Sequence, residues 1–150
     1  KMSAKQFHDM VNHASGLLGV SETSSDMRDL LDRQATDTRA AEAVELFCYQ
    51  IKKWIGSFAA ALGGVDTVVF TGGIGENAQE VRARICSGLQ FLGIKIDNKK
   101  NKANAQVIST EKSPTKVLVI NTDEELMIAK TLCRILRGDK KHEAGGTVQK

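Results

Sequence analysis

The sequence lacks the cysteine and histidine patterns that hold disulfides or structural metals. Its three cysteines, Cys48, Cys86 and Cys133, are far apart and form no CxxC pair. An odd, widely spaced set argues against a disulfide framework and favours a reducing, cytoplasmic compartment. The histidines offer no ligand pair, because His8 and His13 are five residues apart and are predicted to lie on different faces of a helix. Zinc binding is therefore not expected.

Two further absences bear on the class of partner. No apolar run is long enough to cross a bilayer, and no signal-peptide segment is found near the start. The net charge is only +3, and the lysine-rich run at 95–102 has no interleaved aromatic residues. A solvated loop explains that run better than a nucleic-acid-binding face does. We therefore expect neither a membrane nor a nucleic acid as a partner.

What is present is enough apolar material for one domain, with helical patterns in the first half of the chain. The 150 residues are 41% apolar. Ser3 and Gln6 have capping-box spacing, which predicts a helix over 3–14, and a loop is expected over 16–24. The longest helix is predicted at 38–62, where one buried stripe recurs at three- and four-residue steps. The stripe comprises Val44, Phe47, Cys48, Ile51, Trp54, Ile55, Phe58 and Leu62.

In the second half, strand patterns alternate with helical patterns. Short apolar runs predict strands at 67–70, 94–96, 107–109 and 116–120, with helices over 78–89 and from Thr122 to about residue 137. This alternation favours an α/β fold with a mostly parallel sheet flanked by helices, some antiparallel pairing, and the long helix packed across it. We expect one domain over 1–137 and a charged, disordered tail over 138–150.

The glycine-rich segment 72–77 is the strongest candidate site. It follows a predicted buried strand and precedes a predicted helix, where free N–H groups and the helix dipole favour anions. The spacing of Gly73, Gly75 and Ala78, with Asp97 further along, also fits the loose dinucleotide-binding fingerprint. It is not a P-loop. A tight turn that needs glycine for geometry alone explains the pattern nearly as well, so both readings stay open.

Two acidic segments are weaker candidates. Residues 123–125 follow a predicted strand, and the simple interpretation is helix capping, with Glu125 reaching back to Thr122 in a second capping box. Glu124 is then available to hold a metal ion or its water. Residues 24–28 taken alone predict a helix cap with solvated charges.

Together these segments resemble acetate kinases in order and spacing. The resemblance is carried by Gly-Leu-Leu-Gly-Val-Ser at 16–21, Ser-Ser-Asp-Met-Arg-Asp at 24–29, Val-Phe-Thr-Gly-Gly-Ile-Gly-Glu-Asn at 69–77 and Asn-Thr-Asp-Glu-Glu-Leu at 121–126. It spans residues 7–136. It implies the C-terminal domain of the acetate and sugar kinase/Hsp70/actin (ribonuclease H-like) fold, in which two related domains close on a nucleotide.

The resemblance also implies roles for particular residues. It implies reversible transfer of the ATP γ-phosphoryl group to the carboxylate of acetate or a similar short-chain acid, by a cytoplasmic homodimer that uses ATP or ADP and Mg²⁺. Glu124 matches the family's magnesium-associated glutamate. The nucleotide-binding residues would be Asp26, Met27 and Arg28 on the adenosine side, with Gly73, Ile74, Gly75, Glu76 and Asn77 lining the site.

The sequence departs from the family in two ways. Family members often have Pro-Thr-Asn-Glu-Glu where this chain has Asn-Thr-Asp-Glu-Glu at 121–125. The amino-terminal phosphate motif and the acyl-binding residues are missing, because the similarity covers only about the final third of such an enzyme. We therefore expect negligible kinase activity from this chain alone, and acetate cannot be distinguished from propionate or butyrate.

Two alternatives remain at this stage. One is a stand-alone dinucleotide-binding module, although such folds usually have the glycine turn after their first strand. The other is a dimerisation module that uses the helix at 38–62, which would require apolar residues of that helix to be exposed in the monomer.

Overall fold

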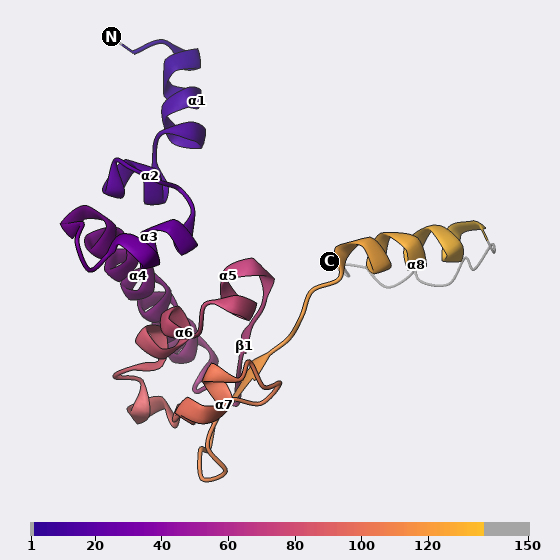
Figure 1. Ribbon diagram of the computed structural model, residues 1–150. Coiled ribbons are helices and arrows are strands. Elements are labelled where there is room, and N and C mark those ends of the chain that lie inside the picture. Colours follow the sequence, from indigo (N-terminus) through magenta and orange to yellow (C-terminus); the bar gives the residue numbers. More distant parts are fainter. Residues whose placement is uncertain (1, 137–150) are drawn as a thin grey trace, which may run out of the picture. The chain divides into compact units, whose positions relative to one another are not determined.

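The structure is a computed structural model that describes residues 2–136 (Figure 1). The described residues fall into two units, which are divided after Ile120. The first unit contains helices α1 (Ala4–His13), α2 (Gly16–Ser21), α3 (Met27–Arg33), α4 (Thr38–Leu62), α5 (Gly72–Asn77), α6 (Gln79–Cys86) and α7 (Asn98–Lys102), with strands β1 (Thr67–Phe70) and β2 (Lys116–Val119). The second unit contains α8 (Glu124–Leu136). None of the described helices is long and apolar enough to cross a membrane.

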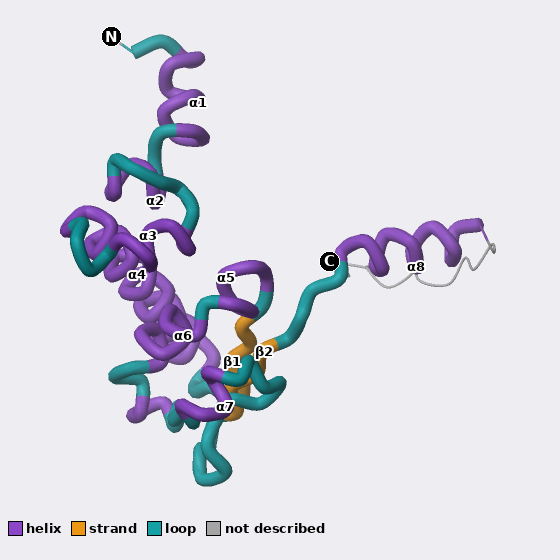
Figure 2. Tube along the Cα trace, viewed as in Figure 1, coloured by secondary structure: helices purple, strands orange, loops and turns teal. Residues whose placement is uncertain are grey.

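The two strands lie side by side as a parallel pair (Figure 2). Thr67 is opposite Lys116, and Phe70 is opposite Val119. A parallel pair needs a long crossover, and α5, α6 and α7 lie within it. Single bridges extend the pairing, parallel at Ile94–Thr115 and antiparallel at Ile96–Ser109 and Val107–Leu118. The predicted parallel pairing with some antiparallel pairing is confirmed, but 94–96 and 107–109 form isolated bridges instead of strands.

The start of the chain is helical for longer than predicted. The capping box is confirmed, since Ser3 Oγ accepts from the Gln6 N–H and Gln6 Oε1 accepts from the Ser3 N–H. The predicted loop at 16–24 is wrong in its first part, because residues 16–21 form α2. Leu17 and Val20 pack against the core, and this burial stabilises a helix too short to be stable by itself.

Helix α4 has the predicted bounds, but its apolar stripe is only half covered. The Asp37 side chain accepts from the Arg39 and Ala40 N–H groups at its start, and Gly63 ends it at φ 75°. The stripe is buried at Val44 and Cys48 and partly buried at Phe47, Ile51 and Ile55, whereas Trp54, Phe58 and Leu62 are 55%, 59% and 77% exposed. The prediction of a fully buried stripe is wrong, because the described elements of the first unit leave the last turns of α4 uncovered.

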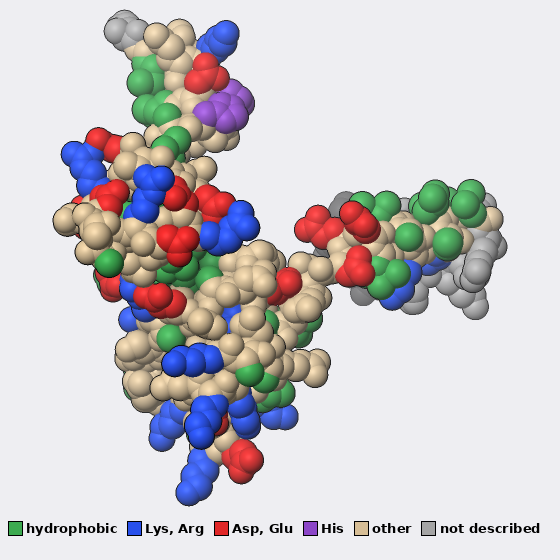
Figure 3. Space-filling view, in the orientation of Figure 1, with side chains coloured by type: hydrophobic (Ala, Val, Ile, Leu, Met, Phe, Trp, Pro, Cys, Tyr) green, Lys and Arg blue, Asp and Glu red, His purple; other side chains and the backbone are tan. Residues whose placement is uncertain are grey.

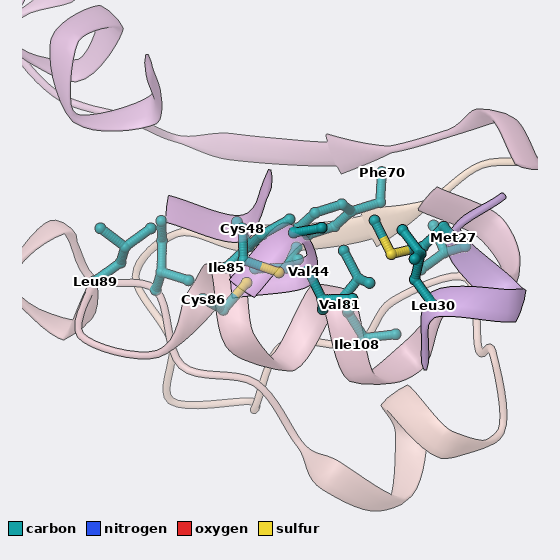
Figure 4. Close-up of a cluster of buried hydrophobic side chains, with 14 of the residues drawn as sticks. Met27, Leu30, Val44, Cys48, Phe70, Val81, Ile85, Cys86, Leu89 and Ile108 are labelled. Carbon is teal, nitrogen blue, oxygen red and sulfur yellow. The ribbon is translucent and has the colours of Figure 1, made fainter. Parts of the chain in front are cut away.

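The core lies where α3, α4, α6 and β1 meet. Figure 4 shows the Phe70 ring, from the end of β1, among Val44 and Cys48 of α4 and Val81 of α6. Met27 of α3 belongs to the same cluster and is 3% exposed. A fully buried side chain of this size contributes about 1.5–3 kcal/mol. This core therefore holds the start of α3 and the end of β1 in one place.

The glycine-rich segment is a helix and not a turn. Residues 72–77 form α5, and a separate helix, α6, begins at Gln79 and ends at Cys86, which corrects the predicted helix over 78–89. The C-cap residue Ser87 is extended, with φ −62° and ψ 127°, and so ends the helix, and Gly88 follows in the left-handed region at φ 84°. Two short helices joined at Ala78 thus replace the predicted turn and single helix.

The cap of helix α8 is one residue later in the sequence than predicted. Asp123 Oδ1 accepts from the Leu126 N–H at 2.8 Å, so Asp123 caps the helix, where the sequence predicts Thr122. No residue of α8 is buried, and its apolar side chains are visible along the helix in Figure 3. They include Met127, Ile128, Leu132 and Ile135, which are 54–69% exposed. The predicted tail at 138–150 lies outside the described residues.

Candidate functional site

A pocket of about 750 Å³ lies between the start of α3 and one side of α5. It brings together six of the eight residues predicted to bind nucleotide, although they come from segments more than forty positions apart in the sequence. Those six are Asp26, Met27, Arg28, Gly73, Ile74 and Asn77, and the pocket is completed by Leu31, Asp32 and Ala78, which were not predicted.

On the α3 side, Asp26 and Arg28 form one hydrogen-bonded unit. Asp26 Oδ1 accepts from the Arg28 backbone N–H at 2.8 Å and caps the helix. The guanidinium donates from Nη2 to Oδ2 at 2.7 Å and from Nε to Oδ1 at 3.2 Å. These bonds hold the pKa of the Asp26 carboxyl below its usual range, the side-chain bond being the larger cause. The pair leaves the Arg28 side chain 87% exposed at the pocket, where its planar face can stack on an aromatic ring.

Met27 anchors this side of the pocket. It is buried in the core with Leu30, one turn further along α3. The Asp26–Arg28 unit therefore has a fixed position relative to β1, although both of its own side chains are exposed. Leu31 and Asp32 follow on the same helix and extend the lining.

On the α5 side, Gly73 has open space where a side chain would be. A β-carbon there would meet no atom within 4 Å outside the local backbone, so nothing in the protein requires glycine on steric grounds at this position. Asn77 Nδ2 donates to the Gly73 carbonyl at 2.9 Å and closes the short helix. The Gly72 N–H donates to Glu76 Oε1 at 3.0 Å, so one of the N–H groups that we expected to be free for an anion is already bonded.

Gly75 and Glu76 do not line the pocket. A β-carbon at Gly75 would lie 3.1 Å from the carbonyl carbon of Phe70, so this glycine allows α5 to pack closely against the end of β1. The carbonyls of Gly75 and Glu76 both accept from Nη1 of Arg82. These two residues thus hold α5 in place, and their predicted contact with nucleotide stays a prediction.

Arg82 was missed by the sequence reading. It is fully buried on α6. Ile85 and Cys86 follow it at three- and four-residue steps and are buried on the same side. The burial of Arg82 could have been predicted from the sequence, because this charged residue shares a helix face with apolar residues.

Asp97 has a structural role outside the pocket. Its Oδ1 accepts from the Lys99 N–H at 2.8 Å and from the Lys100 N–H at 3.1 Å, and so caps α7. The lysine-rich loop expected at 95–102 is helical over most of its length. The residue that the dinucleotide reading needed for a ribose contact is therefore used as a helix cap.

The histidine prediction was wrong. Side-chain ligand atoms of His8, Asp9 and His13 all lie within 4.8 Å of one another. The two imidazole rings meet edge to face with centroids 6.3 Å apart. Both rings are exposed, and His13 is the last residue of α1. Glu124, the expected magnesium-associated residue, is the exposed first residue of α8 in the second unit.

The fold class follows from solved structures. The chain superimposes on the acetate kinase of Porphyromonas gingivalis with a TM-score of 0.83 and 42% identity, over 90% of this chain and 35% of that one. It superimposes on the acetate kinase of Entamoeba histolytica with a TM-score of 0.82 and 34% identity, over 87% and 36%. The chain therefore has the acetate and sugar kinase fold, as predicted.

The chain belongs to the acetokinase family. The family's model matches residues 1–130. The acetate kinase of Carboxydothermus hydrogenoformans is 50% identical over 132 residues, which are 86% of this chain and 33% of that protein. The propionate kinase of Salmonella typhimurium is 49% identical over 132 residues, 87% and 33%. The chain thus spans about a third of the length of the curated relatives that it matches.

Proposed function

We propose that this chain carries the adenosine side of the nucleotide site of a short-chain acyl kinase. The complete enzyme would reversibly transfer the γ-phosphoryl group of ATP to the carboxylate of acetate or a close homologue. The observation that supports this most is the pocket between α3 and α5, which gathers Asp26, Arg28, Gly73 and Asn77 from distant segments. Similar proteins are named both acetate kinase and propionate kinase, so the acyl group is proposed only as a short-chain carboxylate.

The lining suggests how the two ends of a nucleotide would lie. The exposed Arg28 guanidinium offers a flat surface to a nucleobase. Gly73 presents backbone without a side chain, which suits close approach of a ligand. In phosphoryl transfer the protein mainly positions the reactants and neutralises developing charge. The α3 side would therefore bind the nucleoside, and α5 would support the phosphates.

Glu124 is the proposed magnesium residue. Mg²⁺ is held in nucleotide sites by one or two carboxylates, waters and substrate phosphates, and an exposed carboxylate in the first turn of α8 suits that role. The ion would neutralise phosphate charge when bound. Glu124 would contribute an oxygen ligand or hold one of the ion's waters.

We further propose a cytoplasmic homodimer that uses α4 at the interface. Trp54 and Phe58 stack on each other with centroids 5.9 Å apart and are both exposed. Aromatic side chains are enriched at protein interfaces.

The cysteines support the proposed cytoplasmic location. Among the described residues the three cysteines are free, and burial raises the pKa of the Cys86 thiol to about 12, which suits a chain that keeps its cysteines reduced.

The test is calorimetric titration of this chain with Mg-ADP, with NAD as the comparison ligand. We expect ADP to bind and Arg28→Ala to weaken it by about tenfold, since the lost contact is a charged or stacking one of about 1–2 kcal/mol. Arg33→Ala is the matched control, because Arg33 is on the same helix, pairs with Asp29 and does not line the pocket.

Each result has a definite meaning. Preferential binding of NAD, or no binding of ADP, would contradict the assignment of a nucleotide site to this chain. An equal loss in both variants would mean that the effect is not specific to the pocket. The chain alone is expected to form acetyl phosphate only at the background rate, because it spans about a third of its relatives.

A further inference from the structure

Arg82 donates every N–H of its guanidinium within the protein. Nε donates to Asn101 Oδ1 at 2.8 Å. Nη1 donates to the carbonyls of Gly75 and Glu76 at 2.7 and 2.9 Å. Nη2 donates to the Asn101 carbonyl at 2.9 Å and to Asn104 Oδ1 at 2.6 Å. A guanidinium has five N–H donors, so the fork is fully satisfied.

The acceptors are all neutral. They are carbonyl and amide oxygens, and among residues 2–136 no carboxylate forms an ion pair with Arg82. The side chain is nevertheless fully buried. Burial lowers the pKa of Arg82, but arginine stays protonated in proteins. A buried cation that has no ion-pair partner among the described residues is costly to fold, so its position relative to the pocket bears on its role, as do its hydrogen bonds.

The Arg82 charge is bonded to a helix that lines the pocket. Two of its bonds are to the carbonyls of Gly75 and Glu76 in α5, and three further residues of that helix, Gly73, Ile74 and Asn77, line the pocket. A helix is about 10 Å across, so the guanidinium and a ligand against α5 would be separated by on the order of 10 Å. With an effective dielectric constant of about 20, one unit charge at that distance changes affinity by about tenfold.

We propose that Arg82 is a positioning residue that holds α5 at the pocket and supplies a buried positive charge favouring the polyphosphate of a nucleotide. This inference rests on the proposed nucleotide site. It adds a residue that does not touch the ligand and whose effect grows with ligand charge. A purely structural role would change the binding of every ligand of the pocket to the same degree.

The sharpest test leaves Arg82 and its bonds in place and cancels its charge. Asn104 is exposed, with φ 49°, and accepts from Nη2 through Oδ1. Aspartate tolerates this left-handed conformation as asparagine does, so Asn104→Asp sets a carboxylate against the guanidinium with little change of shape. Asn98→Asp is the matched control, because it makes the same chemical change at an exposed position at the start of α7.

Adenosine, AMP, ADP and ATP are titrated into the complete chain and both variants in EDTA, so that the phosphate charge is not masked by metal. We expect Asn104→Asp to weaken the affinity for ADP and ATP by about 3- to 10-fold. The affinity for adenosine should change by less than about twofold, and the effect on AMP should lie between the two. The Asn98→Asp chain should bind all four ligands like the wild type. Arg82→Met, with folding followed by circular dichroism, should show the same order of losses.

The outcomes separate the two proposals. Failure of the wild-type chain to bind any nucleotide would contradict the proposed function. Wild-type binding with equal losses for adenosine and ATP in Asn104→Asp, or with no loss for either, would overturn the role of the Arg82 charge. If Arg82→Met does not fold, the Asn104→Asp series decides the question by itself.

Discussion

At the scale of single residues, Gly73 and Gly75 show how two glycines of one motif can be needed for different reasons. A β-carbon at Gly75 would lie 3.1 Å from the carbonyl carbon of Phe70, whereas one at Gly73 would meet nothing within 4 Å. Gly75 is therefore required by packing within the chain. Gly73 is free of that requirement, and it lines the pocket.

This difference predicts opposite effects of one substitution. Gly75→Ala should destabilise the chain by about 1–3 kcal/mol, because the backbone of β1 must shift to admit a methyl group. The free energy of unfolding of Gly73→Ala should stay within about 1 kcal/mol of the wild type or increase, since alanine favours the helix. The same substitution should weaken the binding of ADP. Urea unfolding and calorimetry measure the two effects. Equal destabilisation by both substitutions would contradict the distinction.

At the scale of elements, short helices depend on particular caps. Asp97 caps the five-residue helix α7, and its bonds from the backbone, chiefly from the Lys100 N–H, lower the pKa of its carboxyl. A lowered folded-state pKa gives stability that is present above the unfolded pKa, about 4, and is lost as the pH falls through the folded value.

Asp97→Asn therefore changes the pH dependence of stability. Asparagine retains a capping oxygen but cannot ionise, so the variant should be less stable than the wild type at pH 6 and should lose less stability on acidification to about pH 3. Urea midpoints at the two pH values measure this. Asp66→Asn removes a charge without removing a helix cap, and serves as control. If the urea midpoint changed equally between the two pH values in the wild type and in Asp97→Asn, the cap would not depend on the charge.

The success of prediction also varied by element. Long or strongly capped elements could be predicted, as the bounds of α4 and the capping box of α1 show. Helices α2 and α5, each six residues long, could not. Propensity favours a loop or a turn in such glycine-containing segments, and packing of Leu17, Val20 and Ile74 on the core decides otherwise.

At the scale of the whole molecule, the exposed end of α4 has a consequence for assembly. Phe58→Glu should shift the proposed dimer towards monomer in sedimentation equilibrium, because it brings a charge into the stacked pair formed with Trp54. Ser57→Glu is the control, since it adds the same charge at an adjacent exposed position on a different face of the helix. A wild-type chain that is monomeric at every concentration would contradict dimerisation through this chain.

The sequence by itself determined the family, the two paired strands β1 and β2, and the identity of most pocket residues. Each of these rests on local information: periodicity, caps, and short motifs such as the one at 69–77. Only the tertiary structure decided that Gly75 packs on Phe70, that Gly73 lines the pocket, and that Arg82 is buried and bonded to the carbonyls of α5. These facts depend on which distant backbone lies within a few ångströms, and that distance is set by packing and not by the order of residues.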